Sequence, residues 1–173
     1  MLVDVRVEGS NGGAAPGESG ELLVRGPNVM AGYWRRPDAT RAVLTPDRWL
    51  RTGDAARMDE LGFVWIVDRV ADGFTTDGQR IYPGDVERVL GGHPAVREVG
   101  VAGVRDEIRG NVGVACVVLS PGVQATEPEL LAFCAEGLAP HQVPVSVRFT
   151  DQLPRNSVGK LIRSQLHTLA VGS

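Results

Sequence analysis

The segment Arg51-Thr52-Gly53-Asp54 places a carboxylate beside a glycine, two residues after Trp49. A carboxylate accepts several hydrogen bonds, so Asp54 on a loop could bind a vicinal diol such as the 2′- and 3′-hydroxyls of a ribose. The same residues can also make an Asx-turn or cap a helix. Taken alone, these four residues favour that simpler interpretation.

A second candidate is Lys160, which follows a glycine at the end of the segment Leu153–Lys160 and precedes an expected helix. An ammonium group on such a loop is well placed to meet anionic oxygens. The segment is not a phosphate-cradling P-loop, because the Gly-x4-Gly-Lys-Ser/Thr spacing is absent. Taken alone, Lys160 favours a solvated surface charge.

Two glycines, Gly73 and Gly78, lie where the backbone could bend or approach a ligand closely. The pair Asp77-Gly78 predicts a tight turn between short strands. Without further context, this stretch is interpreted as a linker and a hairpin followed by a capped helix.

The elements that must position these residues differ between the two parts of the chain. Residues 1–68 predict strands and loops without a long amphipathic helix, and therefore only a partial core. The expected elements there are strands at Leu2–Val7, Glu21–Arg25 and Phe63–Val67, a short helix at Asp38–Leu44 and a hairpin turn at residues 59–62.

From about residue 70 onward, strands and helices alternate. Strands are expected at Phe74–Thr76, Arg80–Tyr82, Val96–Val104, Val112–Leu119 and Val145–Phe149, and helices after Pro83, after a capping box at 126–129 and over Lys160–Leu169. This mixture predicts an α+β fold in which a β-rich N-terminal subdomain precedes a small domain of helices against a sheet.

Composition restricts the partners. The formal net charge is −3 and the 18 basic residues are dispersed, so nucleic acid and anionic membranes are poor candidates. No apolar run approaches the roughly 20 residues of a membrane span. Cys116 and Cys134 lie in apolar stretches without metal-ligand spacing, which favours buried, reduced thiols and a cytoplasmic protein.

The order of the short segments carries more information than any one of them. In sequence they are Gly17-Glu18-Ser19-Gly20-Glu21-Leu22, Gly32-Tyr33-Trp34, Arg51-Thr52-Gly53-Asp54, Asp68-Arg69, Gly78-Gln79-Arg80-Ile81-Tyr82-Pro83, Val86-Glu87, Leu153-Pro154 and Gly159-Lys160. This succession resembles the C-terminal third of the ANL superfamily, which holds acyl-CoA ligases, nonribosomal-peptide adenylation domains and luciferases. The resemblance covers residues 1–169, and Tyr82-Pro83 is more similar to the acyl-CoA ligases.

The resemblance implies an AMP-forming acid–thiol ligase that uses ATP and CoA. Asp54 would hold the ribose hydroxyls of ATP and then of the AMP moiety, and Arg69 would add a second ribose contact. Lys160 would be catalytic, bridging the substrate carboxylate and the phosphate oxygens. A lid would then rotate about a hinge at Ala71 and Asp72 and bring the turn at Gly78 to the site of CoA attack.

In family terms, residues 1–69 would be the last subdomain of the large lobe and residues 70–173 the mobile C-terminal lid. Three positions depart from the family pattern. Ala71 stands where Asp or Lys is usual, Asp77 where the residue is often small, and Gln142 where a lysine is common.

The phosphate-binding loop and the adenine-binding segment of the family are absent from the sequence. Mg²⁺ ligands are expected in that missing lobe, and we expect no metal site here, because His93, His141 and His167 do not cluster. We therefore expect a fragment that is inactive alone and reaches the carboxylic acid, ATP and CoA only together with the missing lobe. It could also self-associate through residues 1–68.

Two other interpretations stay open at this point. The chain could be a non-catalytic module that binds a partner ligase or a nucleotide in trans. It could also be a natural half-enzyme that a separate N-terminal subunit completes.

Overall fold

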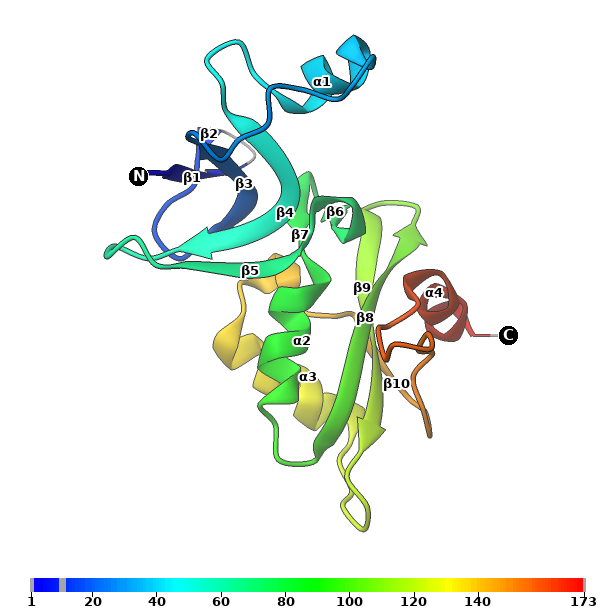
Figure 1. Ribbon diagram of the computed structural model, residues 1–173. Helices are drawn as coiled ribbons and strands as arrows, with labels where there is room; N and C mark the ends of the chain where they lie inside the picture. Colours follow the sequence, from blue (N-terminus) through cyan, green and yellow to red (C-terminus); the bar gives the residue numbers. More distant parts are fainter. Residues whose placement is uncertain (1, 10–11, 173) are drawn as a thin grey trace. The chain divides into compact units, whose positions relative to one another are not determined.

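The computed structural model describes residues 2–9 and 12–172, and the chain divides into two compact units, Met1–Ala71 and Asp72–Ser173. This division falls two residues beyond the boundary expected between residues 69 and 70. Each unit has a sheet of its own (Figure 1). The α+β class predicted from the sequence is confirmed.

The first unit is an antiparallel sheet with the strand order β2-β1-β3-β4-β5. Its elements are β1 Asp4–Gly9, β2 Gly12–Gly13, β3 Ser19–Arg25, α1 Pro37–Val43, β4 Leu50–Met58 and β5 Val64–Arg69. The long strand β4 is visibly curved in Figure 1. Its register shifts against both β3 and β5, and such irregularities bend a strand.

The core of the first unit is small. A buried cluster consists of Val7, Leu22 and Ala56, with a few half-buried apolar side chains packed around them, and Leu23 and Ala55 are buried as well. Beside it, Trp49 is buried between two guanidinium groups, those of Arg6 and Arg25, at 4.3 and 4.7 Å from the ring centroid. A sheet of this size without a covering helix buries little apolar surface.

The second unit is built around β9, which pairs with β8 along one edge and with β10 and β6 along the other. Among the strands that the structure describes, only the β9–β10 pair is parallel. Its elements are η1 Val70–Asp72 at the junction of the units, β6 Phe74–Thr76, β7 Gln79–Ile81, α2 Pro83–Gly91, β8 Val96–Asp106, β9 Gly110–Leu119, α3 Glu127–Gly137, η2 Pro140–Gln142, β10 Ser146–Phe149 and α4 Arg163–Val171.

Helices cover both faces of this sheet. Figure 1 shows α2 and α3 on one side of β8 and β9, with α4 on the other. Side chains alternate along a strand, so Ala115 and Val117 face the α2–α3 layer, whereas Val114, Cys116 and Val118 face α4. A strand buried on both faces carries a continuous apolar run, which explains why the sequence predicts β9 so clearly.

Three details differ from the sequence prediction. The short strand β2 and the long strand β4 were not predicted, and the last helix begins at Arg163 rather than at Lys160. The segment 155–161 is held out of the helix by a β-bridge between Arg155 and Leu161. Among the described residues, no helix is long and apolar enough to cross a membrane.

Candidate functional site

Asp54 and Arg69 lie opposite each other on the neighbouring strands β4 and β5. Arg69 Nη1 donates to Asp54 Oδ1 over 2.8 Å, and the two side chains are 29% and 64% exposed. One carboxylate oxygen is therefore oriented by the guanidinium while the group stays within reach of solvent. This arrangement can accept hydroxyl donors such as those of a ribose.

The backbone around Asp54 is fixed by its neighbours. Its N–H donates to Thr52 Oγ1 over 3.1 Å, and the Thr52 hydroxyl donates to the Leu22 carbonyl over 3.0 Å. Gly53 has a φ of 73°, which favours glycine. The sequence predicts a loop here, and that prediction is wrong: Asp54 is inside β4, where the strand is irregular.

Arg51, three residues before Asp54, serves the sheet. It donates to Glu21 over 2.5 Å and to Glu8 over 3.1 Å, and these carboxylates raise the pKa of its guanidinium, chiefly through the hydrogen bond that Glu21 accepts. Its charge is therefore already balanced by side chains of β1 and β3.

Lys160 is the only lysine in the sequence. Its backbone is held on both sides, since its N–H donates to Asn156 Oδ1 over 2.9 Å and its carbonyl accepts from the Asn156 N–H over 2.9 Å. Its side chain is exposed, and no carboxylate among the described residues pairs with its ammonium group. Hydrogen bonds therefore hold the backbone of this loop in place, while the ammonium group of Lys160 is exposed and is not neutralised by a carboxylate of the described residues.

Both ends of the Lys160 loop are tied to the sheet. Before it, Arg155 donates to Glu98 of β8 over 2.7 Å and to the Gly159 carbonyl over 2.7 Å. After it, Arg163 at the start of α4 is ion-paired with Glu87 of α2.

The Glu87–Arg163 pair reaches a third element as well. Arg163 donates to the Val101 carbonyl of β8 over 3.2 Å, and Glu87 accepts from the Val101 N–H over 2.9 Å. Glu87 and Arg163 are 76 residues apart, so sequence spacing alone could not have paired them.

Gly78 lies in the β6–β7 turn that the sequence predicts. It has a φ of 78°, and a Cβ added there would meet nothing within 4 Å. The conformation therefore favours glycine, and the space beside its backbone is open.

The expected site residues do not all lie in one unit. Asp54 and Arg69 belong to the first, Gly78 and Lys160 to the second, and the division falls between Ala71 and Asp72. No group of three or more metal-ligating side chains occurs within the described residues. Both cysteines are buried free thiols, and burial raises the pKa of Cys134 to about 11.

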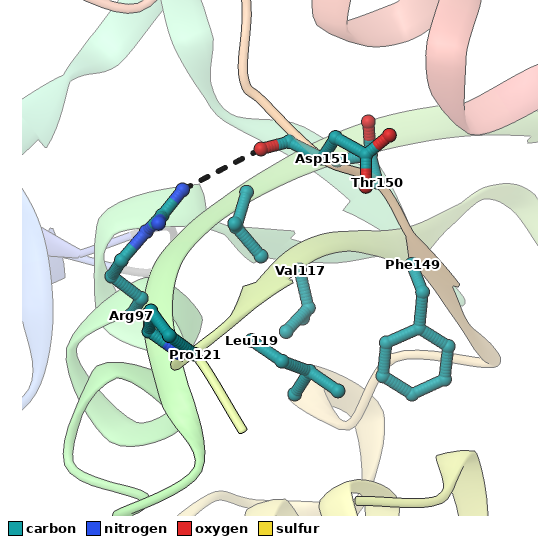
Figure 2. A pocket seen from close by; sticks show the side chains of 8 residues that line it. Arg97, Val117, Leu119, Pro121, Phe149, Thr150 and Asp151 are labelled. Carbon is teal, nitrogen blue, oxygen red and sulfur yellow. Dashed lines mark hydrogen bonds between the residues drawn. The ribbon is translucent and has the colours of Figure 1, made fainter. Parts of the chain in front are cut away.

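A hollow of about 550 Å³ lies beside β10 and was not expected from the sequence. Figure 2 shows Arg97 reaching across it toward Asp151, with Phe149 at its far side. None of the expected site residues lines it. The hollow therefore adds nothing to the candidate site.

Comparisons with known proteins were consistent with the resemblance. Residues 85–160 match the AMP-binding enzyme C-terminal domain. A 2-succinylbenzoate–CoA ligase from Geobacillus kaustophilus is 46% identical over 156 residues, which are 90% of this chain and 32% of the relative. A long-chain-fatty-acid–CoA ligase from Bacillus subtilis is 48% identical over 153 residues, which are 88% of this chain and 27% of the relative.

Solved structures of adenylate-forming enzymes also match this chain. The o-succinylbenzoate CoA synthetase MenE from Bacillus subtilis, in complex with the acyl-adenylate intermediate OSB-AMP, has a TM-score of 0.76 and 40% identity, covering 96% of this chain and 34% of that one. The chain thus spans about a third of the length of the proteins it matches. It belongs to the ANL superfamily of adenylate-forming enzymes and corresponds to their C-terminal portion.

Proposed function

We propose that this chain is the C-terminal portion of an ATP-dependent acyl-CoA ligase. A carboxylate and ATP give acyl-AMP and pyrophosphate, and the thiol of CoA then displaces AMP to give the thioester. The proposal is carried by the similarity to CoA ligases together with the accessible Asp54–Arg69 pair and the unbalanced Lys160 cation. The two relatives act on different acids at 46% and 48% identity, so we propose a carboxylic acid as a class.

In this proposal Asp54 binds the ribose hydroxyls in both reactions. Arg69 holds one oxygen of that carboxylate, which orients the other for the nucleotide. Lys160 acts in the first reaction only, where its ammonium group balances negative charge on the carboxylate and phosphate oxygens. A fixed cation in such a place stabilises a charge-rich transition state by several kcal/mol.

The change between the two reactions is proposed to occur at Ala71 and Asp72. These residues lie in the 3₁₀ turn η1, where the two compact units join. Rotation there would withdraw Lys160 and bring the open backbone face of Gly78 to the adenylate. The proposed cofactors are thus ATP, AMP and CoA, with Mg²⁺ held outside this chain.

The two reactions should respond differently to substitution of Lys160. In a complete ligase containing this chain, Lys160→Ala should slow acyl-AMP formation by about 10²–10³-fold and leave thioester formation from synthetic acyl-AMP near normal. Asp54→Ala should slow both reactions, because ribose binding is needed in each. Acyl-AMP formation from ATP and thioester formation from synthetic acyl-AMP are measured separately.

Arg88→Ala provides the matched control, since Arg88 is an exposed cation of the same unit on α2. It should change neither rate. Equal slowing of both reactions by Lys160→Ala would refute the two-position proposal and make Lys160 a general binding residue.

The chain by itself should not exchange pyrophosphate into ATP, because no phosphate-binding loop is present in the sequence. Exchange above background that Lys160→Ala abolishes would contradict this expectation. The alternative of a natural half-enzyme predicts activity only when a separate N-terminal subunit is added, whereas a non-catalytic module predicts none, and that mixture is the test.

We also propose a cytoplasmic location for the protein. Both cysteines are free, buried thiols, which is typical of proteins in a reducing compartment.

A further inference from the structure

Two turns of the second unit are bound to each other. Arg109, in the β8–β9 turn, donates through Nε to Asp77 Oδ2 over 2.9 Å, and its Nη2 lies 2.8 Å from the same oxygen. In return, the Asp77 N–H donates to the Arg109 carbonyl over 3.0 Å. Asp77 is therefore held through both its side chain and its backbone, directly beside Gly78.

The Arg109 side of this contact is itself rigid. Asp106 Oδ1 accepts from the N–H groups of Ile108 and Arg109 over 2.9 and 2.8 Å, and these bonds lower the pKa of Asp106. Gly110 closes the turn with a φ of 86°. A three-residue connection, here residues 107–109, with a left-handed glycine next to it is a common way to close a hairpin, so the backbone of Arg109 has little freedom.

The Asp77 side is anchored by the preceding residue. Thr76 is 1% exposed, and its hydroxyl donates to the Asn111 carbonyl of β9 over 2.7 Å. Thr76 also pairs with Gly110 across the β6–β9 bridge. The turn at Gly78 is thus attached at three successive residues, Arg109 of the β8–β9 turn and Gly110 and Asn111 of β9, while the space beside Gly78 is open.

The conformation of the turn does not by itself explain why position 77 carries a carboxylate. Its φ is 51° and that of Gly78 is 78°, the two left-handed conformations that a type I′ turn requires. Aspartate tolerates this region better than most side chains, but asparagine or glycine would satisfy the turn as well. The turn conformation therefore does not require a carboxylate, whereas the contact with Arg109 does.

We propose that Asp77 and Arg109 form a positioning pair that fixes the Gly78 turn for attack by the CoA thiol. This inference rests on the proposed function. Both side chains are substantially exposed, at 49% and 34%, so their attraction is screened by solvent and contributes little to overall stability. Their effect is geometric, and a displacement of about 1 Å at a reacting site can slow a reaction up to about 100-fold.

The pairing is tested first on the chain itself by amide hydrogen exchange at positions 77 to 79. Arg109→Gln and Asp77→Asn each keep the size of the side chain, and asparagine also tolerates the left-handed conformation. Each should raise exchange at position 77 by about fivefold, in line with local opening of the turn. Asp4→Asn, which breaks the similarly exposed Asp4–Arg25 pair of the other unit, should not. Unchanged exchange in both variants would overturn the proposal.

The second measurement uses a complete ligase containing this chain and a double-mutant cycle. Each variant should lower kcat for thioester formation from synthetic acyl-AMP by about tenfold, and the double variant should be no slower than either single one. Acyl-AMP formation and the KM for CoA should stay unchanged. If Arg109 instead contacted CoA directly, Arg109→Gln alone would raise the KM for CoA, and the pair would not be a positioning device.

The two measurements separate this inference from the proposed function. If an unmodified ligase containing this chain formed no acyl-AMP, the proposed function would be refuted at its first reaction. The Asp77–Arg109 pair would then have no catalytic role either. Normal acyl-AMP formation with unaltered thioester rates in both variants would overturn the positioning role alone.

Discussion

At the scale of single residues, the positively charged side chains near the candidate site differ in whether a carboxylate of the chain pairs with them. Arg51, Arg69 and Arg163 are each bound to a carboxylate of the chain. Lys160 has no carboxylate partner among the residues that the structure describes, and it is the only lysine of the sequence. A cation kept in place by its backbone and left unbalanced is available for an anionic substrate.

Removal of the Glu87 charge should destabilise the second unit. Glu87 and Arg163 are only 17% and 28% exposed, so Glu87→Gln removes a negative charge that is bound to a largely buried guanidinium. We expect a loss of about 2 kcal/mol in the free energy of unfolding. The measurement is urea denaturation followed by the helical circular dichroism signal.

An internal control comes from the position of the aromatic residues. All three tryptophans, Trp34, Trp49 and Trp65, lie in the first unit, so their fluorescence reports that unit alone. Glu87→Gln should shift the dichroism transition and leave the fluorescence transition in place. Asp38→Asn, which removes the exposed pair with Arg41 on α1, should shift neither. A Glu87→Gln protein as stable as the parent would show that the buried pair contributes nothing.

At the scale of elements, sequence patterns located most of the second unit. The capping box at Thr126 and Glu129, the turn at Asp77-Gly78 and the apolar run of β9 are local or period-2 signals, and the structure confirms them. Strand β4 carries no such signal. Its residues 51–57 are polar or small, and its pairing with β3 and β5 decides its conformation, since strand formation depends strongly on tertiary context.

The candidate site likewise has parts that the sequence predicts and parts that depend on tertiary packing. The motif residues could be named from the sequence, and so could the turn at Gly78. The ion pairs that fix them, Glu87–Arg163 and Asp77–Arg109, join residues 76 and 32 apart. No periodicity or capping rule links such positions, because their contact depends on how the helices and hairpins pack.

The N-terminal cap of α3 should contribute measurably to the stability of the second unit. Thr126 Oγ1 accepts from the Glu129 N–H over 3.4 Å, while the Glu129 carboxylate accepts from the Thr126 N–H over 2.7 Å. Thr126→Ala should cost about 1 kcal/mol, and Thr126→Ser, which keeps the hydroxyl, should cost much less. Urea denaturation at neutral pH measures both.

This cap should also depend on pH. The backbone and hydroxyl of Thr126 lower the pKa of Glu129 in the folded chain. A carboxyl with a lowered folded pKa stabilises the fold above its unfolded pKa and loses that contribution as the pH falls through the folded one. The difference between the parent and Glu129→Gln should therefore shrink from about pH 7 to about pH 3. A constant difference would mean that the charge of Glu129 is unimportant.

At the scale of the whole molecule, the two units differ in how completely they bury their apolar side chains. The second has helices on both faces of its sheet and two clusters of buried residues. The first has one small cluster and several large exposed apolar side chains, including Trp34, Leu61, Phe63, Trp65 and Ile66. An exposed apolar surface of this kind usually marks an interface.

We expect the chain to self-associate through the first unit. Strand β5 is at the end of the sheet order, so one of its edges lacks a strand partner within the described residues. Phe63, directly before that strand, and Trp65, its second residue, are 63% and 52% exposed, with ring centroids 6.3 Å apart. An unprotected edge with apolar side chains pairs readily with another chain.

Sedimentation over a concentration series should therefore show a dimer or larger species that dissociates on dilution. Trp65→Lys should weaken this association by about tenfold or more, because it places a charge on the edge strand and removes a large apolar contact. Ile108→Lys is the matched control, since Ile108 is 94% exposed but lies on a turn of the second unit. A protein that stays monomeric at high concentration, or equal weakening by both substitutions, would show that β5 is not the contact surface.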